Sequence, residues 1–321
     1  RGPFVCRRCG VDCETAERAL FQARRDPGCH AGMAPGPDNP ELRWSVEEIK
    51  MTPSRHDSVP DRDERVERFS ACNYARNLIR AIFNNDKQQE DNCIRVQILA
   101  CNYLQLFYMY HSLRREDAKM VAVAATFLAC KVIDLPRKMR GILRAVNQMR
   151  VQTGEPELGE EEQSKLCERV LCTERLLLRI IRFEFDLALP LDALAGLTEA
   201  LLVQLTRSKV FIAQCKGTPQ QEALALRPEL LRVAERFVLD SFMGFAPLLA
   251  EPRVVAAGAL AIATRYIRRE LATAEMCKLL HAADCSLEEA EVKHVVDEIL
   301  SVFRTKSQAP CAAAGAGGGA A

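Results

Sequence analysis

Two alanine-rich segments, one in each half of the chain, constrain the fold more than any other feature of the sequence. V-A-V-A-A-T-F-L-A-C-K-V-I (residues 121–133) aligns without gaps with V-A-A-G-A-L-A-I-A-T-R-Y-I (residues 255–267), and five of the thirteen positions are identical. A helix that is apolar or small on nearly every side is buried at the centre of a bundle. The lag of 134 residues is far longer than a solenoid repeat. The sequence therefore predicts two similar helical bundles in tandem.

Length and composition agree with this interpretation. The 321 residues correspond to about two domains. With 44 Lys and Arg, 43 Asp and Glu and 48% hydrophobic residues, the composition is that of a globular protein and does not indicate a protein built mainly to neutralise nucleic-acid phosphate. The longest apolar run, residues 120–130, is shorter than the roughly 18 residues that span a bilayer, and no secretory signal is visible. We expect no membrane partner.

Helical periodicity extends over residues 43–303, without convincing β alternation. Ser45 and Glu48 form a capping box for a short helix that ends before Pro53, and Ser286 and Glu289 repeat this pattern. Further helices are predicted near residues 63–83, 94–113, 116–133, 137–149, 161–183, 193–214, 228–245, 252–269, 272–281 and 286–303. The fold class is therefore all-α, with two five-helix bundles preceded by a short helix.

The domain boundaries follow from shifts in composition. We predict a first bundle with its preceding helix over residues 43–190 and a second bundle over residues 191–304, with Pro190 at the junction. Residues 1–42 and 305–321 are rich in Gly, Pro, Ala or charge without apolar periodicity, so both ends are predicted to be disordered. The glutamate-rich stretch 151–162 is predicted to be a solvated acidic insertion.

The usual catalytic signatures are missing. The sequence has no G-x-x-x-x-G-K-[ST], G-x-G-x-x-G, G-x-S-x-G or H-E-x-x-H motif. Its five histidines lie in separate segments, and none is spaced with a carboxylate or a cysteine as in a catalytic site. We therefore predict no catalytic residues, no enzyme activity and no cofactor.

Cysteines offer one candidate metal cluster. Cys6 and Cys9 have the C-x-x-C spacing by which two thiolates share a zinc ion, and Cys13 and Cys29 lie nearby. Cys29 is directly followed by His30, so the second ligand pair lacks the usual separation, and a disordered leader is the alternative. Most other cysteines are scattered singly through helical patterns, as reduced thiols are, which indicates a cytosolic or nuclear compartment.

Four segments of the first half resemble one family, the transcriptional cyclins of the T, K and L types. Residues 43–55 resemble their N-terminal helix and T/S-P-S-R turn. The other segments resemble their Y-x-x-R-F-Y, F-L-A-x-K-x-E-E-x-P and E-x-x-L-L motifs, at residues 102–113, 127–140 and 173–190. Residues 240–257 are similar, more loosely, to the start of the second cyclin box. The resemblance extends over residues 43–303 and also implies two tandem five-helix boxes.

The resemblance implies a regulatory subunit that forms a heterodimer with a cyclin-dependent kinase and activates it. By motif position, Lys131 donates to backbone carbonyls of the kinase, and Glu174 orients Lys131 and bonds the kinase in turn. The apolar contact positions of the family correspond to Leu128, Val132, Leu178 and Phe183. The alternative is a solvated ion pair beside ordinary core residues. A transcriptional cyclin further implies a nuclear location and, by analogy alone, RNA polymerase II as the substrate of the complex.

Some positions depart from the family pattern. Ile133 and Asp134 replace the two glutamates of K-x-E-E, and Leu106 replaces the usual arginine before F-Y. Leu106 removes an internal salt bridge of the family, so helix contacts in the first box must differ. Ile133 adds apolar surface beside the predicted interface. These departures leave the subtype and the kinase open.

Two other functions fit a tandem cyclin-like fold. One is a DNA-binding transcription factor of the TFIIB type, which would need a basic face; the net charge of +1 argues against it. The other is a helical scaffold that activates no kinase. We expect a kinase partner and no direct contact with nucleic acid.

Overall fold

The computed structural model describes residues 42–83, 90–185, 187–268 and 271–308. All the regular secondary structure in these ranges is helical, which confirms the predicted all-α class. Tertiary contacts divide the chain into two compact units between Phe183 and Glu184, a little before the predicted junction at Pro190. Among the described residues, no helix has both the length and the apolar character needed to cross a membrane.

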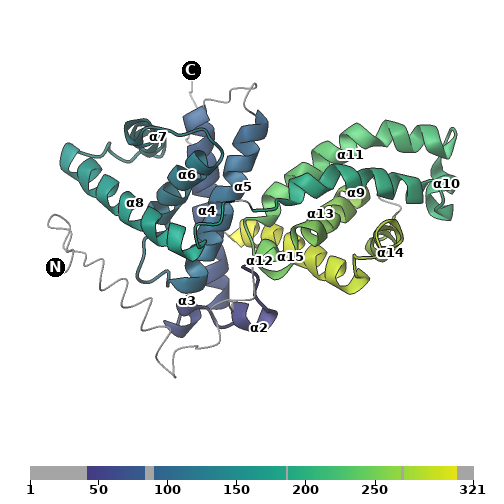
Figure 1. Cartoon of the computed structure of the whole chain (residues 1–321), viewed down its shortest axis with the longest axis horizontal. Coiled ribbons are helices and arrows are strands. Elements are labelled where there is room, and N and C mark those ends of the chain that lie inside the picture. The colour runs from purple at the N-terminus through teal and green to yellow at the C-terminus, as the bar shows by residue number, and fades with distance from the viewer. Residues whose placement is uncertain (1–41, 84–89, 186, 269–270, 309–321) are drawn as a thin grey trace, which may run out of the picture. The chain divides into compact units, whose positions relative to one another are not determined.

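The first unit surrounds one central helix (Figure 1). The central α6 (Ala118–Val132) contacts the four other long helices of this unit, and its residues 120–130 are all buried. The remaining helices of this unit are α2 (Val46–Ile49), α3 (Pro53–His56), α4 (Asp61–Phe83), α5 (Glu90–Tyr110), α7 (Met139–Gln152) and α8 (Glu160–Ile180). Of these, α5 is also buried on nearly every side, from Val96 to Met109 with the exception of Asn102. The alanines of α6 allow these neighbours to approach closely.

The second unit repeats this arrangement around α13 (Pro252–Ile267), which is buried from Val254 to Thr264. Its neighbours all contact it, and they are α9 (Pro190–Leu205), α11 (Pro219–Ser241), α14 (Thr273–Ala283) and α15 (Glu289–Gln308). Gly258 is required here, because a Cβ atom at this position would lie 2.6 Å from Val295 Cγ1 on α15. The two short helices of the unit are α10 (Lys209–Gln214) and α12 (Ala246–Leu249).

Local signals explain several helix ends. The capping box of Ser45 and Glu48 is confirmed. At the end of α6, Asp134 has a φ of 54°, its N–H donates to the Lys131 carbonyl at 3.2 Å, and the Leu135 N–H donates to the Cys130 carbonyl at 2.9 Å. This is a Schellman motif, and aspartate is one of the few residue types that tolerate the left-handed conformation. The motif gives a physical reason for Asp134 at a position where the family has glutamate.

Three predictions about helix boundaries were wrong. The predicted helix 193–214 is two helices, because Ser208 caps a new helix at Lys209. The helix predicted to start at Pro228 starts at Pro219, where Thr218 caps it, and Pro228 lies inside α11. The predicted box of Ser286 and Glu289 does not form, because the Ser286 hydroxyl donates to Asp284 at 2.7 Å and α15 begins at Glu289.

A buried ionic cluster fastens the N-terminal turn to the first unit. Glu64 and Arg68, one turn apart on α4, are both fully buried and lie 2.8 Å apart. The Thr52 hydroxyl and Arg55 Nε both donate to the Glu64 carboxylate, at 2.9 and 2.7 Å. Arg68 also donates to backbone carbonyls of α5 at Gln105 and Tyr108, at 3.1 and 2.6 Å. The T-P-S-R turn is therefore held by the α4 charges, which the apolar periodicity of the sequence did not reveal.

The described cysteines are free thiols, as expected. Cys72, Cys101, Cys130 and Cys277 are buried. Burial raises the pKa of the Cys130 thiol to about 12, so the group stays protonated and unreactive at neutral pH.

Candidate partner-binding site

Lys131 lies where the buried run of α6 ends. Residues 120–130 of the helix are all buried, whereas the Lys131 side chain is 41% exposed. Its four-carbon stem leaves the core at the C-terminal turn, where the helix macrodipole favours a positive charge. The ammonium group lies 3.9 Å from the centroid of the Phe127 ring, one turn earlier. Phe127 was not among the predicted site residues, although its i, i+4 spacing to Lys131 indicates this contact.

Glu174, on α8, holds the Lys131 ammonium group in place. Lys131 Nζ donates to Glu174 Oε1 at 2.6 Å, and the glutamate side chain is only 9% exposed. The two residues are 43 positions apart in the sequence, so the pair forms only because α6 packs on α8. The pair therefore links a nearly buried carboxylate to an ammonium group that solvent can reach.

The pair keeps hydrogen-bonding capacity for another molecule. An ammonium group has three N–H donors. Within the described part of the chain, the Lys131 ammonium group uses one of them for Glu174, and Glu174 Oε2 accepts no hydrogen bond. The site therefore presents donors and one acceptor side by side, which suits the backbone of another protein.

Apolar side chains continue the site along α8. Leu178 lies one turn after Glu174 and is half-buried, and Leu171 lies nearly one turn before it and is exposed. Residues at these spacings share one helix face. Leu171 was not predicted as a site residue, although the sequence places this apolar residue three positions before Glu174, a predicted binding residue.

The other predicted apolar positions differ in exposure. Phe183 has a 61% exposed side chain just beyond the end of α8, and Val132 and Ile133 are half-buried. Leu128 is only 2% exposed, so it fills the core and supports α6 from inside. Arg182 and Phe183 both have left-handed backbone, with φ values of 56° and 60°. This turn ends the helix and leaves the Phe183 ring exposed.

The second copy of the repeat does not form the same pair. Arg265, which aligns with Lys131, donates to the hydroxyl of Thr273 at 2.7 Å. No salt bridge to Arg265 occurs within the described residues. Among the described residues, the buried carboxylate paired with an exposed ammonium group is therefore found in the first unit and not at the aligned position of the second.

Metal and catalytic candidates have little support in the described residues. No cluster of three or more metal-ligating side chains occurs in the described ranges. The candidate zinc ligands Cys6, Cys9, Cys13 and Cys29 lie outside these ranges. His111 stacks on Phe107 with ring centroids 4.4 Å apart, and burial lowers its pKa to about 4. This histidine has a packing role.

Comparisons of sequence place the chain beside known cyclins. It is 26% identical to cyclin Pch1 of Schizosaccharomyces pombe over 84% of this chain and 71% of that protein. It is 24% identical to Cyclin-K of zebrafish, Danio rerio, over 71% of this chain and 46% of that protein. Cyclin-T1-2 of rice, Oryza sativa, is 26% identical over 68% of this chain and 30% of that protein. The chain thus spans less than half the length of the last two relatives. No family model matches the sequence.

Comparisons of structure agree on the fold. One similar chain belongs to the yeast RNA Pol II CTD kinase CTDK-1 complex, with a TM-score of 0.55, 13% identity and coverage of 82% of this chain and 73% of that one. Another belongs to the CAK complex of Chaetomium thermophilum, with a TM-score of 0.52, 14% identity and coverage of 92% of this chain and 84% of that one. At such low identity these likenesses support the fold alone. The curated relatives that the sequence matches are cyclins, so this chain has the fold of the cyclins in these complexes and is similar in sequence to cyclins of the K and T types.

Proposed function

We propose that this chain is the regulatory subunit of a cyclin-dependent kinase that phosphorylates the C-terminal repeat domain of RNA polymerase II. The chain itself performs no chemistry. It binds the kinase through the surface formed by Lys131, Glu174, Leu178, Phe183 and Val132, to which we add Leu171. We further propose that the complex acts in the nucleus.

The observation that carries the proposal is the nearly buried Glu174 bonded to the half-exposed Lys131 at 2.6 Å. Within the described part of the chain, Glu174 Oε2 accepts no hydrogen bond and is not fully buried, so it can still accept one from another protein. A kinase that supplies an N–H to this oxygen and backbone carbonyls to Lys131 satisfies both groups.

The mechanism that follows is conformational. A protein kinase needs a glutamate of its regulatory helix paired with the lysine that positions ATP. A cyclin that binds only the arrangement with this pair formed shifts the kinase toward it by the difference in affinity for the two states. Lys131 and Glu174 provide directional bonds to the end of that helix, and the apolar side chains along α8 provide area.

The DNA-binding alternative has less support. Sequence similarity is to cyclins, and the net charge of +1 gives no general attraction to phosphate. Kinase capture and duplex binding separate the two functions.

An exchange of the two charges tests the proposal directly. The Lys131→Glu/Glu174→Lys variant keeps an ion pair inside the cyclin but presents the opposite charges to a partner. The matched control is Glu161→Lys/Lys165→Glu. These two residues form an equally short ion pair, 2.6 Å, on the exposed side of α8, the helix that carries Glu174. Each full-length protein is used to capture partners from a nuclear extract, and captured material is assayed on a polymerase-tail peptide.

The wild type and the control should capture a kinase and phosphorylate the peptide, and the Lys131/Glu174 exchange should reduce both at least tenfold. Circular dichroism must show equal helicity in all three proteins. If the exchanged variant captures as much kinase as the wild type, Lys131 and Glu174 are not part of the kinase interface. Absence of a captured kinase with the wild type would contradict the regulatory function itself.

A further inference from the structure

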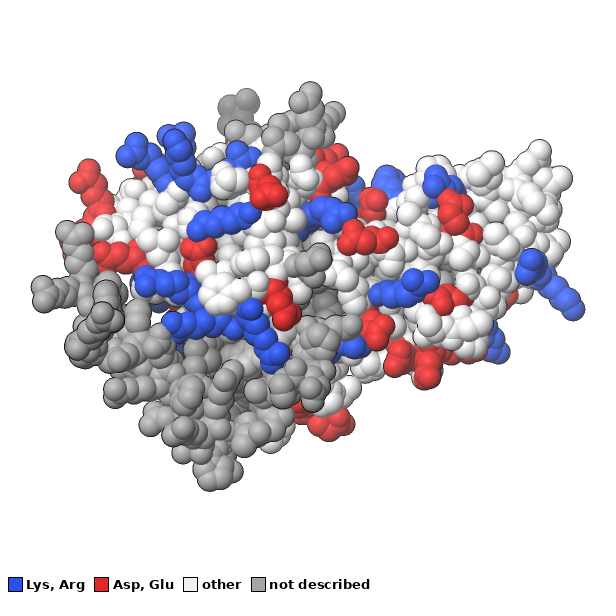
Figure 2. Space-filling model, in the orientation of Figure 1, with Lys and Arg blue, Asp and Glu red and all other residues white. Residues whose placement is uncertain are grey.

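Helix α7 and the two residues before it concentrate positive charge in a chain whose net charge is only +1. From residue 137 to residue 152 the sequence has no acidic residue and five basic ones, Arg137, Lys138, Arg140, Arg144 and Arg150. Figure 2 shows Lys and Arg side chains gathered over this helix. Such a local field attracts anions even though the whole chain is nearly neutral.

Two of these basic side chains have structural roles. The Arg137 guanidinium lies 4.5 Å from the centroid of the Phe83 ring. Arg150 Nε donates to the Pro156 carbonyl at 2.9 Å, and its Nη1 lies 3.0 Å from Glu155. In contrast, Arg140 and Arg144, both exposed, form no hydrogen bond or ion pair within the described ranges. They are one turn apart, so both guanidinium groups can reach one ligand.

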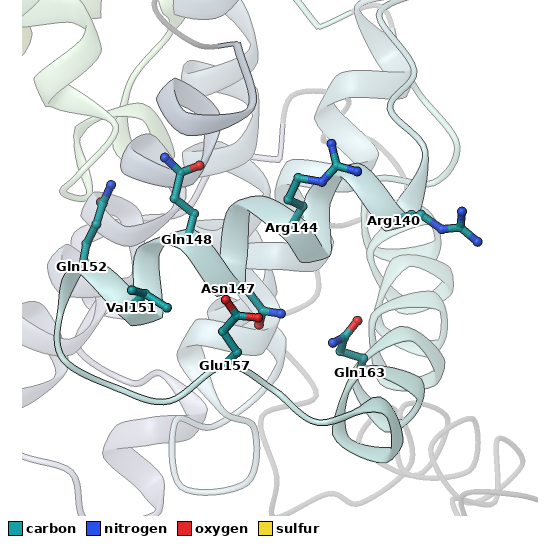
Figure 3. Close-up of a pocket in the computed structure, with 8 residues that line it drawn as sticks. All are labelled: Arg140, Arg144, Asn147, Gln148, Val151, Gln152, Glu157 and Gln163. Carbon is teal, nitrogen blue, oxygen red and sulfur yellow. The ribbon is translucent and has the colours of Figure 1, made fainter.

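These two arginines line an open pocket of about 480 Å³ between α7, the following loop and the start of α8 (Figure 3). This loop belongs to the stretch 151–162 that was predicted to be a solvated insertion. Hydrogen bonds from Leu158 hold it to both α7 and α8. The Leu158 N–H donates to Asn147 Oδ1 at 3.1 Å, and the Leu158 carbonyl accepts from Gln163 Nε2 at 2.8 Å. The far wall of the pocket is therefore formed before any ligand binds.

The lining changes character along α7. Arg140 and Arg144 lie toward one end in Figure 3, and the apolar Val151, 53% exposed, lies at the other. Gln148 contributes a carboxamide between them, and Glu157 on the loop contributes a carboxylate. Paired guanidinium groups bind phosphate through several N–H donors. Carboxamides and a single carboxylate suit the N–H and C=O groups of an extended peptide.

We propose that this pocket binds a phosphorylated peptide segment of another protein, with the phosphate on Arg140 and Arg144 and an apolar side chain against Val151. A nucleic-acid strand suits the pocket less well. No aromatic ring lines it for base stacking, and Glu157 repels a second phosphate. The site does not depend on the kinase-binding function proposed above.

The helix geometry sets the spacing of the peptide. Arg144 and Val151 are seven residues apart on α7, which is about 10 Å at a rise of 1.5 Å per residue. An extended peptide covers this distance in about three residues. The expected ligand therefore has a phosphorylated residue and a large apolar residue three positions apart.

The test uses the full chain and fluorescent peptides in a binding titration read by anisotropy. The probes are glycine- and serine-flanked peptides with phosphoserine and leucine three positions apart, in both orders, and the same peptides without phosphate. Arg140→Gln/Arg144→Gln removes the two free charges. The matched control is Arg62→Gln/Arg114→Gln, two exposed arginines of the same unit outside the pocket. All four substitutions are at exposed positions, and unchanged thermal unfolding verifies the fold.

We expect at least one phosphorylated order to bind ten or more times tighter than its unphosphorylated form. The pocket variant should lose this preference and the control should keep it. Val151→Ser should weaken binding of the leucine peptide but not of a peptide with alanine in its place. Binding that is independent of phosphorylation, or equal loss in the control, would overturn the proposal. If a single-stranded oligonucleotide competes as well as the phosphopeptide, the pocket binds anions in general and the proposal of a phosphopeptide site is wrong.

Discussion

Lys131 Nζ on α6 lies 2.6 Å from Glu174 Oε1 on α8, and the two partners differ strongly in burial. Glu174 is nearly buried, whereas Lys131 is 41% exposed. Loss of the lysine leaves a carboxylate in the protein interior without its counter-charge. Loss of the glutamate charge leaves an ammonium group that water can still reach.

Stability should therefore respond asymmetrically to the two single substitutions. Lys131→Met, which keeps the stem over Phe127, should lower the free energy of unfolding by about 1–3 kcal/mol, and Glu174→Gln by less than about 1 kcal/mol. Urea unfolding at pH 7 measures both values. The double variant should recover part of the Lys131→Met loss, because no charge then remains buried. Equal losses in the two single variants would contradict the inferred role of burial.

Arg68 should be among the most sensitive positions of the first unit. It is fully buried and bonded to Glu64 and to two backbone carbonyls of α5. Arg68→Met should cost about 3–5 kcal/mol, because it leaves the Glu64 carboxylate buried with fewer donors. The control is Arg65→Met on the same helix, where a half-buried arginine pairs with the exposed Asp61 at 3.2 Å, and its cost should be much smaller, about 1 kcal/mol. Chemical denaturation of both variants measures the difference.

Gly258 and Gly196 should respond in opposite directions to alanine. At Gly258 the added methyl group would meet Val295 Cγ1 at 2.6 Å, so α13 and α15 must separate, at a cost of about 1–3 kcal/mol. At Gly196, in α9, nothing lies within 4 Å of the new Cβ atom. Gly196→Ala should stabilise the protein by about 0.5–1 kcal/mol through helix propensity. Thermal unfolding followed by circular dichroism compares the two. A stabilised Gly258→Ala variant would be incompatible with the close approach of the two helices.

His111 should make the first unit less stable in acid. Burial, and to a lesser degree Arg115, lowers the pKa of its imidazole from 6.5 to about 4 in the folded state. Between these values the unfolded chain binds a proton that the folded chain does not, so stability falls as the pH drops from about 6.5 to about 4. The resulting loss of stability is roughly 3 kcal/mol when complete.

The His111→Phe variant isolates this effect, because phenylalanine can retain the stacking on Phe107 but cannot titrate. The difference in unfolding free energy between pH 7 and pH 4.5 should be smaller in the variant than in the wild type. Carboxylates such as Glu116, whose pKa is raised by burial, titrate in both proteins and cancel in the comparison. An identical pH dependence in the two proteins would mean that His111 can be protonated in the folded state.

The sequence by itself determined the helical class, the two central helices and most helix positions. These features depend on interactions within three or four residues of the chain, such as the apolar surfaces of α6 and α13 and the Ser45 capping box. The family motifs also selected Lys131 and Glu174 as a pair, although the 2.6 Å bond between them depends on the packing of α6 on α8.

Only the tertiary structure decided which charges are buried and which are free. Arg68 lies on α4 at a spacing that a surface arginine could also have, and its burial follows from the position of the α5 carbonyls. Arg140 and Arg150 belong to one basic segment, yet the fold uses Arg150 to hold a loop and leaves Arg140 exposed beside a pocket. The physical reason is that ionic and hydrogen bonds act over a few ångströms, and the packing of helices distant in sequence sets which groups come that close.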